Sequence, residues 1–489
     1  MIRLTRSFLV FWLLLAMTLT ASAAGIQPIK YVFLFIGDGM SIPQRQMAEE
    51  FVQKTENRGL KINAMPYQAI TTTHAAGDQY TTDSAASGTA IACGTKTKNG
   101  TLGLDAEGNR LESIAELAKK NGRKVGILTS VTINHATPAA FYAHNAGRSN
   151  DYEIGLDMVA SGFDYFGGGG ISSSDNKESK QYCGDIYNLA KEAGYTVCRT
   201  VEEIHALKPG GGKVMSFGAS GDLPYAIDGN REGRRLADFT KQAIELLDNP
   251  NGFFMMVEGG KIDWACHDND AATAIRDTIE FDDAVSAAFD FAKKKPGEVL
   301  IVVTADHETG ALTVGSSGTG YQVYLALLAN QKASKGALAL LTEKFVKDNK
   351  EDATFEKFKS FITEQCGLVF TEEGNWKAGN LNLTKDEMKT LEEDFAASKT
   401  AILEDKGGKN KVAQTMVRLL NSKSGITWSS GGHSALPVNT STWGSQAAQV
   451  AENIRDNTDV AKQLKQAVRA LPGRQRLVLP RTDSLRRAR

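Results

Sequence analysis

Acidic and imidazole side chains in this sequence gather directly after runs of apolar residues. Four such runs, YVFLFIG, KVGILTSVTIN, FFMMV and VLIVVTA, each lead into a polar stretch. These stretches hold the residues that could do chemistry: Asp38, then His135 and Thr137, then Glu258, Asp263 and His267, then Asp306 and His307. Carboxylates with imidazoles select zinc-type cations, and carboxylates with a hydroxyl and water select magnesium. So many acids in one place would be unfavourable unless cations neutralised them, so we expect metal ligands here.

A further stretch, YTTDSAASGTAIACGT, places Asp83 and Ser84 at the head of a run of small residues. A helix of this kind buries little apolar area, so packing alone is a weak reason for it. One interpretation is a capped helix, in which Asp83 or Ser84 accepts backbone N–H bonds and the small residues allow close approach. The other is a helix N-terminus that presents Ser84 to an anion. The stretch by itself leaves both interpretations open.

Each of these residues also has an ordinary explanation when it is taken alone. An Asp after a strand is commonly a turn or cap residue. Asp263 and His267 share a helical face, as many surface pairs do, and His433 in SSGGHSALPV could be a loop histidine. The combination is harder to explain in this way, because four of the seven histidines in the chain lie in these polar stretches.

The apolar runs also indicate the fold. Near-continuous Val, Ile, Leu and Phe is typical of strands covered on both faces, so the four runs are predicted to be buried parallel strands. Helical periodicity lies between them, at residues 111–120, 234–247 and 269–294. This alternation predicts an α/β fold with a large, mostly parallel central sheet flanked by helices. Such sheets bind ligands at the carboxyl ends of their strands, so the polar stretches should converge on one rim.

The chain divides into five predicted segments. They are a secretory signal peptide (1–24), a first part of the core (25–330), an inserted helical subdomain (331–425), a second part of the core with the last candidate ligand (426–469) and a disordered basic tail (470–489). The signal sequence has a charged start, an apolar centre and small residues at its end, which predicts a periplasmic or secreted protein with no membrane anchor after cleavage. Within the core, residues 166–230 are rich in Gly, Ser and Asp and are expected to be elaborated loops with short elements.

Charge and cysteine content narrow the function further. The 489-residue chain has a net charge of −1, but the signal and the tail carry an excess of arginine, so the body between them is acidic. An acidic body argues against a nucleic-acid partner. Five cysteines show no zinc-ribbon spacing, and in an oxidising compartment Cys183 and Cys198 are the pair that we expect to form a disulfide.

Six motifs together resemble one family. In order and spacing, GDGM, TDSAAS, HATPAAFYAHNAGR, VEGGKIDWACH, TADHETG and GGH resemble the motifs of the alkaline phosphatase family. The resemblance runs from about residue 30 to 310 and resumes near 428 to 465. It implies hydrolysis of phosphate monoesters at a site with two zinc ions and one magnesium ion. It also implies that Ser84 becomes phosphorylated during the reaction, which favours the second interpretation of the small-residue helix.

The resemblance also implies a role for each site residue. The first zinc would be held by Asp263, His267 and His433. The second would be held by Asp38, Asp306 and His307, and would contact the Ser84 oxygen. The third site, normally magnesium, would be completed by Asp38, Thr137 and Glu258. Arg148 would bind phosphate through its planar guanidinium, with Asp83 orienting it.

Two positions depart from the best-studied bacterial members, which have Asp and Lys where this chain has His135 and Trp264. Without the Asp, we expect magnesium to be held less tightly, and His135 could recruit another divalent cation. Trp264 offers no positive charge to phosphate, so we expect product phosphate to bind more weakly.

Other functions remain as alternatives at this point. A phosphodiesterase or a sulfatase of the same superfamily is one, although the residues after Ser84 do not form a sulfatase-type Cys-x-Pro-x-Arg segment. A non-catalytic metal- or phosphate-binding protein is another, but simple binding needs no nucleophile. Members of the family are commonly homodimers, so we expect a homodimer on that basis alone.

Overall fold

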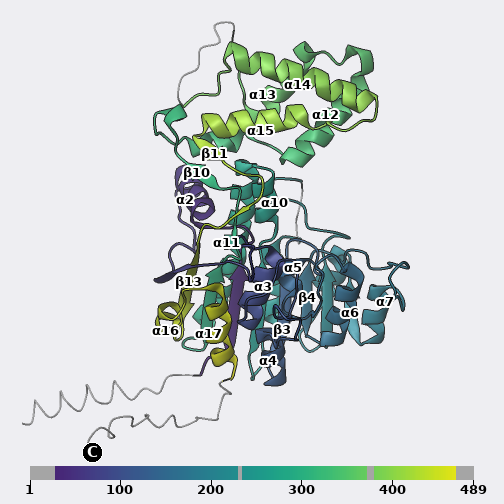
Figure 1. Cartoon of the computed structure of the whole chain (residues 1–489), viewed down its shortest axis with the longest axis vertical. Helices are drawn as coiled ribbons and strands as arrows, with labels where there is room; N and C mark the ends of the chain where they lie inside the picture. Colours follow the sequence, from purple (N-terminus) through teal and green to yellow (C-terminus); the bar gives the residue numbers. More distant parts are fainter. Residues whose placement is uncertain (1–27, 230–233, 372–378, 470–489) are drawn as a thin grey trace, which may run out of the picture.

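The structure is a computed structural model that describes residues 28–229, 234–371 and 379–469 (Figure 1). The predicted signal peptide, 1–24, and the predicted basic tail, 470–489, lie outside the described residues. In the part of the chain that is described, no helix is both long and apolar enough to cross a membrane.

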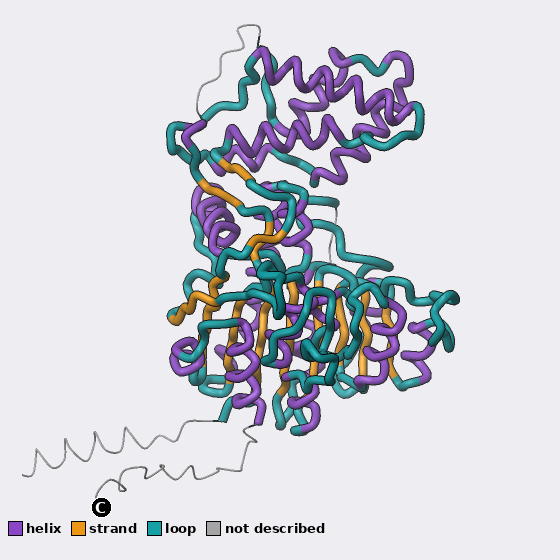
Figure 2. The backbone as a smooth tube through the Cα atoms, viewed as in Figure 1, coloured by secondary structure: helices purple, strands orange, loops and turns teal. Residues whose placement is uncertain are grey.

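A nine-stranded sheet forms the centre of the molecule (Figure 2). Among the described residues its strand order is β2-β13-β8-β1-β7-β3-β4-β6-β5, and β13 alone runs opposite to the other eight strands. The strands are β1 (Tyr31–Ile36), β2 (Tyr67–Thr71), β3 (Lys124–Thr129), β4 (Tyr165–Gly168), β5 (Tyr195–Cys198), β6 (Lys213–Phe217), β7 (Phe253–Glu258), β8 (Val299–Thr304) and β13 (Val438–Gly444). The α/β fold with a large, mostly parallel sheet is therefore confirmed.

Helices cover both faces of the sheet, which explains the continuous apolar runs. In β1, Phe33 and Phe35 belong to the apolar core on one face, and Val32 and Leu34 belong to the core on the other. The first core is completed by α2 (Ile42–Glu56), α8 (Val201–Ala206), α9 (Leu236–Leu247) and α11 (Ala271–Lys294). The second is completed by α3 (Ser84–Cys93), α4 (Ile114–Lys120), α6 (Asp151–Ser161), α7 (Ile186–Glu192), α16 (Ala447–Glu452) and α17 (Asn457–Arg469). Alternating side chains of one strand thus need apolar partners above and below.

A group of helices, the α12–α15 bundle, lies beyond the rim of the sheet (Figure 1). It consists of α12 (Lys335–Asn349), α13 (Phe355–Cys366), α14 (Lys385–Leu403) and α15 (Lys411–Lys423). Aromatic rings hold it together, with the Phe358 and Phe395 centroids 4.5 Å apart. Two short ladders lie between the bundle and the sheet: β9 (Glu308–Thr309) pairs with β12 (His433–Ser434), and β10 (Leu312–Val314) pairs with β11 (Ile426–Trp428).

The segment 166–230 contains more regular structure than the sequence indicated. Most of β4, together with β5 and β6, lies in this segment and completes one side of the sheet. These strands have only four or five residues, and β4 ends in two glycines, so their apolar pattern is too short to distinguish from loop sequence.

The expected disulfide is wrong, because Cys183 and Cys198 are both free thiols. The Cys198 side chain belongs to the apolar core on one face of the sheet. The Cys183 sulfur lies 3.8 Å from the hydroxyl of Tyr152, whose ring packs in the core on the opposite face. The sheet itself therefore separates the two sulfurs.

Candidate active site

Three adjacent parallel strands bring three carboxylates to one rim. Strand β1 lies between β7 and β8, with Ile36 in register with both Glu258 and Thr304. Asp38 lies two residues after Ile36 on β1, and Asp306 lies two residues after Thr304 on β8. Glu258 is the last residue of β7. All three carboxylates are fully buried. Convergence at the carboxyl ends of parallel strands is what the sequence pattern indicated.

A first group of candidate ligands comes from α10 (Lys261–His267) and β12. Asp263 and His267 lie one turn apart on α10, with the His267 Nε2 3.3 Å from Asp263 Oδ2. His433 Nε2 lies 3.2 Å from His267 Nε2 and 3.8 Å from Asp263 Oδ1. The Nδ1 atom of each ring is held by a backbone carbonyl. His267 Nδ1 lies 2.7 Å from the Gly431 carbonyl, and His433 Nδ1 lies 2.9 Å from the Thr82 carbonyl. Such support leaves each Nε2 directed at the group.

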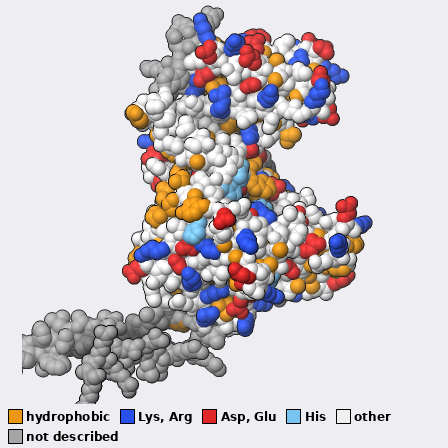
Figure 3. All heavy atoms as spheres, in the orientation of Figure 1, with side chains coloured by type: hydrophobic (Ala, Val, Ile, Leu, Met, Phe, Trp, Pro, Cys, Tyr) orange, Lys and Arg blue, Asp and Glu red, His pale blue; other side chains and the backbone are white. Residues whose placement is uncertain are grey.

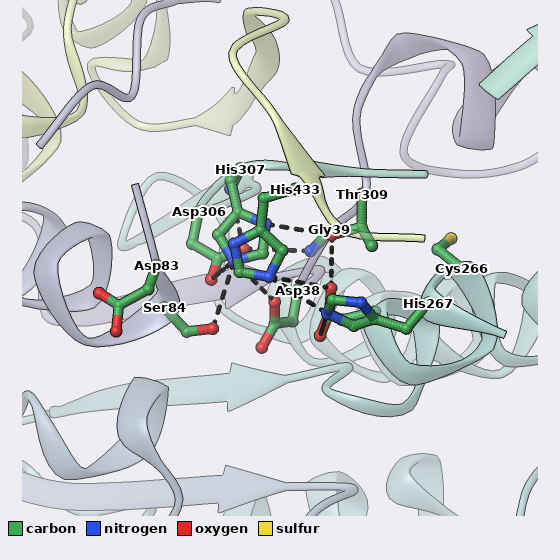
Figure 4. A network of polar contacts seen from close by, with 12 residues as sticks. Asp38, Gly39, Asp83, Ser84, Cys266, His267, Asp306, His307, Thr309 and His433 are labelled. Carbon is green, nitrogen blue, oxygen red and sulfur yellow. Dashed lines mark hydrogen bonds and ion pairs between the residues drawn. The ribbon is translucent and has the colours of Figure 1, made fainter. Parts of the chain in front are cut away.

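A second group surrounds the imidazole of His307 (Figure 4). Its Nε2 lies 3.2 Å from Asp306 Oδ2, 3.4 Å from Asp38 Oδ1 and 3.2 Å from the Ser84 hydroxyl. Potential ligand atoms of Asp38, Asp263 and His307 lie within 4.8 Å of one another, so this group borders the first. Burial lowers the pKa of His307 to about 4, which keeps the ring neutral, the form in which imidazole binds a metal.

A third group lies around Glu258. Potential ligand atoms of Asp38, His135 and Glu258 lie within 4.8 Å of one another. The Thr137 hydroxyl donates to Asp38 Oδ2 at 3.4 Å, and the Thr129 hydroxyl donates to Glu258 Oε2. His135 thus lies with Asp38 and Glu258 in the third group, in a position from which it could recruit a cation.

The carboxylates of these groups are arranged in a way that a cation would stabilise. Burial raises the pKa of Glu258 to about 8 and that of Asp306 to about 6, and it raises the pKa of Asp38 well above its ordinary value. Among the described residues, Glu258 Oε1, Asp306 Oδ2 and Asp38 Oδ1 have no hydrogen-bond partner. Buried acceptors normally have partners, so unsatisfied oxygens next to neutral imidazoles fit divalent cations.

Ser84 is the first residue of α3, and small side chains allow this helix to lie deep in the molecule. Every residue of α3 is buried. An added Cβ at Gly88 would lie 3.2 Å from Ala140 Cβ and 3.4 Å from Thr137 Cα, so the helix packs closely against the α5 (Ala136–Ala139) segment. Asp83 caps the helix by accepting a hydrogen bond from the Ala86 N–H at 2.9 Å. The helix is therefore capped, and it also directs the Ser84 hydroxyl at the imidazole of His307.

Arg148 contacts Asp83, the neighbour of Ser84 in the sequence, and is held at two points. Its Nη1 donates to Asp83 Oδ2 at 3.0 Å, and its Nη2 lies 3.2 Å from His135 Nε2. The indole of Trp264 meets the His135 ring edge to face at 6.0 Å, and the Lys261 ammonium lies 4.6 Å from the indole centroid. A guanidinium, an imidazole and an indole thus form a contiguous group that reaches Asp83, the residue before Ser84.

Some residues of the site were not predicted from the sequence. The Thr309 hydroxyl donates to Asp263 Oδ1 at 2.5 Å, and the Gly39 N–H donates to Asp306 Oδ1 at 3.1 Å. Thr129, described above, acts on Glu258 in the same way. Gly39 and Thr309 both lie in quoted motifs, GDGM and TADHETG, but their contacts are made to residues distant in the sequence, Asp306 after β8 and Asp263 on α10. The spacing of residues within a motif does not reveal which distant residue a side chain or backbone N–H will contact.

The fold and the site together define a class of protein. A mostly parallel sheet whose carboxyl rim holds three candidate metal groups beside a buried serine is typical of a metal-dependent hydrolase. The chain belongs to the alkaline phosphatase family, because the family model for alkaline phosphatase matches residues 29–470. It is a phosphomonoester hydrolase, and its family implies divalent metals.

Similar proteins support the family at the level of sequence. The chain is 31% identical to alkaline phosphatase 3 of Bacillus subtilis (strain 168), over 90% of this chain and 89% of the relative. It is 27% identical to the repressible alkaline phosphatase of Saccharomyces cerevisiae, over 89% and 81% of the two chains.

Solved structures support the fold. A cold-active alkaline phosphatase from Shewanella sp. matches with a TM-score of 0.74 and 26% identity, over 90% of this chain and 99% of that one. The alkaline phosphatase of Thermus thermophilus matches with a TM-score of 0.73 and 26% identity, over 90% and 91%.

Proposed function

We propose that this protein hydrolyses phosphate monoesters through a covalent phosphoseryl intermediate on Ser84, at a site with two zinc ions and one magnesium ion. The observation that carries the proposal is the position of the Ser84 hydroxyl, 3.2 Å from His307 Nε2. A buried serine has no need of such a position in a protein that only binds metal or phosphate. The burial of the nucleophile among candidate ligands is instead suited to nucleophilic catalysis.

The proposed ligand sets follow from the groups described above. Asp263, His267 and His433 would hold the first zinc, Asp38, Asp306 and His307 the second, and Asp38, Thr137 and Glu258 the third cation, which we expect to be magnesium. His135 lies close enough to that last set to replace or add a ligand. When bound, the cations neutralise the carboxylates, lower the pKa of oxygen nucleophiles and stabilise charge on the leaving oxygen.

The residues of the chain would then act on the phosphoryl group in two displacements. Ser84 Oγ attacks phosphorus in line with the ester oxygen, and the alcohol leaves with a proton. Water next displaces the seryl oxygen and releases inorganic phosphate. Arg148 can hold two non-bridging oxygens through both displacements, because Asp83 fixes its guanidinium from behind. Trp264 and His135 would border the same phosphate.

The proposal also includes the surroundings of the enzyme. We expect a periplasmic or secreted homodimer that acts on small phosphate monoesters, because the family and the predicted signal sequence both favour this setting. We further propose that residues 331–425 are an insertion between the two parts of the core, since the α12–α15 bundle lies in this segment and outside the sheet.

The test is hydrolysis of p-nitrophenyl phosphate by the wild-type protein and by Ser84→Ala. We expect the substitution to lower kcat by about 10³-fold or more, because the covalent route is lost. Bis-p-nitrophenyl phosphate is the matched second substrate, and we expect it to react far more slowly than the monoester. Full activity in Ser84→Ala would remove the nucleophile from the proposal, and a preference for the bis-ester would favour a phosphodiesterase.

A further inference from the structure

Three residues, the 268–270 link, join the helix that carries Asp263 and His267 to the long helix α11. Helix α10 ends at His267, the backbone turns through a left-handed conformation at Asn269 (φ 51°), and Asp270 caps α11. The link therefore sets where α10 ends and where His267 stands.

Asp270 is a buried carboxylate whose hydrogen bonds come largely from the start of the α12–α15 bundle. It is 1% exposed. Thr273, in the first turn of α11, donates to it from its backbone N–H at 3.1 Å and from its hydroxyl at 2.7 Å. The Gln331 amide donates at 2.8 and 3.0 Å, and the Lys335 N–H donates at 2.8 Å. Two of its three partner residues thus lie at or just before the start of α12.

Asn269 is held from the other end of the bundle. The amide of Asn421, on α15, donates to the Asn269 carbonyl at 2.6 Å, and the Asn421 side chain is itself buried. The Asn269 amide in turn donates to the Ser430 carbonyl at 2.8 Å, one residue before the Gly431 carbonyl that contacts His267 Nδ1. The bundle therefore contacts the link from α12 and from α15.

His267 needs such support more than Asp263 does. The Asp263 side chain is 5% exposed and is fixed by its surroundings, whereas the His267 side chain is 37% exposed. The position of His267 depends on the backbone at the last turn of α10. Histidine side chains reach the surface near the waist between the bundle and the sheet (Figure 3), which is where the bundle meets the core.

We propose that the α12–α15 bundle positions the first metal group, by holding the 268–270 link through Gln331, Lys335 and Asn421. The inference rests on the proposed function, because it takes His267 as a zinc ligand. Contacts that orient a ligand without touching the metal are commonly worth 10- to 100-fold in metal affinity. Asp270 and Asn421 are therefore positioning residues for zinc rather than catalytic residues.

The experiment measures zinc retention in full-length, metal-loaded protein against a series of chelator concentrations. The variants are Asp270→Asn, which turns one acceptor oxygen into a donor, and Asn421→Ala, which removes the donor to Asn269. Thr415→Val is the matched control, because Thr415 is also a buried residue of α15 but donates at 2.7 Å to Asp394 inside the bundle. His267→Ala serves as the reference for loss of the first zinc.

We expect Asp270→Asn and Asn421→Ala to release one zinc at about tenfold lower chelator concentration than the wild type. The remaining metals should stay bound, added zinc should restore activity, and Thr415→Val should behave as the wild type. If Asp270→Asn does not fold, Asn421→Ala carries the test. Wild-type retention of every metal in Asn421→Ala, or equal weakening of all metals, would overturn the inference. If His267→Ala itself kept all its zinc, the ligand assignment of the proposed function would be the part that fails.

Discussion

Arg148 is the residue that we propose binds phosphate, and its position is set by two neighbours of different charge. Asp83 contacts one nitrogen of the guanidinium and His135 the other. Burial lowers the pKa of His135 to about 4, so this ring is neutral at the pH of the assay. We therefore expect one face of the proposed phosphate site to be bounded by neutral rings, His135 and Trp264, where a cation would bind product more tightly.

Replacing Trp264 by Lys should tighten inhibition by inorganic phosphate by about tenfold, because one charge-assisted hydrogen bond is worth about 1.5–3 kcal/mol. The inhibition constant of phosphate against p-nitrophenyl phosphate hydrolysis measures the effect. Trp264→Phe is the control, since it removes the indole without adding a charge. The nearby Lys261 ammonium is paired with Asp222, so its repulsion of the new lysine is reduced. An unchanged inhibition constant in Trp264→Lys would refute this explanation of weak product binding.

The candidate ligands could be predicted from the sequence because acids and histidines are unusual at the ends of buried strands. Asp38, Glu258 and Asp306 stand out from the apolar runs that precede them. Thr129 and Thr309 could not be found in this way. A threonine at a strand end is ordinary, and what matters is which carboxylate of a distant element its hydroxyl contacts, Glu258 of β7 for Thr129 and Asp263 of α10 for Thr309.

At the scale of elements, the turn after β1 is a point of close approach between two parts of the site. Gly39 has a φ of 68°, and an added Cβ would lie 2.9 Å from both Asp263 Oδ1 and the Thr309 hydroxyl. This turn therefore brings β1 against α10 as closely as the backbone allows. Only glycine combines that conformation with that approach.

Gly39→Ala should lower kcat/KM by at least about tenfold, because the new methyl group displaces Asp263. Gly77→Ala is the matched control: Gly77 also has a positive φ, 80°, and among the described residues no atom lies within 4 Å of its added Cβ. Both variants should lose about 1–2 kcal/mol of stability from the left-handed backbone. Steady-state kinetics measures the effect of displacing Asp263 on kcat/KM, and thermal unfolding measures the effect of the strained backbone on stability. Equal kinetics in both variants would mean that the turn does not position Asp263.

Elements with long patterns were predicted well and short ones poorly. The helix expected at 269–294 is α11, Ala271–Lys294, and the four apolar runs contain β1, β3, β7 and β8. Strands β4, β5 and β6 were missed because four or five residues carry too little periodicity. The expected Cys183–Cys198 bond failed for a related reason, since closeness in sequence does not reveal that a sheet lies between two side chains.

At the scale of the whole molecule, the buried site should make the stability of the metal-free protein depend on pH. Glu258, with a pKa raised to about 8 by burial, stays protonated when folded and ionises when unfolded. His267, with a pKa raised to about 9 by its hydrogen bond to Asp263, also binds more protons when folded above pH ~6.5. Both groups make stability fall as the pH rises from 6.5 to 8.5. His135 and His307, with pKa values of about 4, make stability rise with pH, but only below the unfolded-state pKa of ~6.5, so they do not offset the fall between pH 6.5 and 8.5.

The gap in melting temperature between metal-loaded and chelator-stripped protein should therefore widen by a few degrees between pH 6.5 and 8.5. Cations remove the penalty of ionising Glu258, so the loaded protein should be the less sensitive of the two. Scanning calorimetry of both forms at matched ionic strength provides the measurement. A constant gap over this range would show that the buried carboxylates do not bind the cations.

The most direct test of the central claim is to trap the phosphoryl group on the chain. Metal-loaded protein is mixed with a phosphate monoester, quenched in acid and digested, and the peptides are analysed by mass spectrometry. We expect one added phosphoryl group on the peptide that contains Ser84, assigned by fragmentation to that residue. We expect none in chelator-stripped protein. Hydrolysis with no phosphopeptide, or with the phosphoryl group on another residue, would contradict the claim.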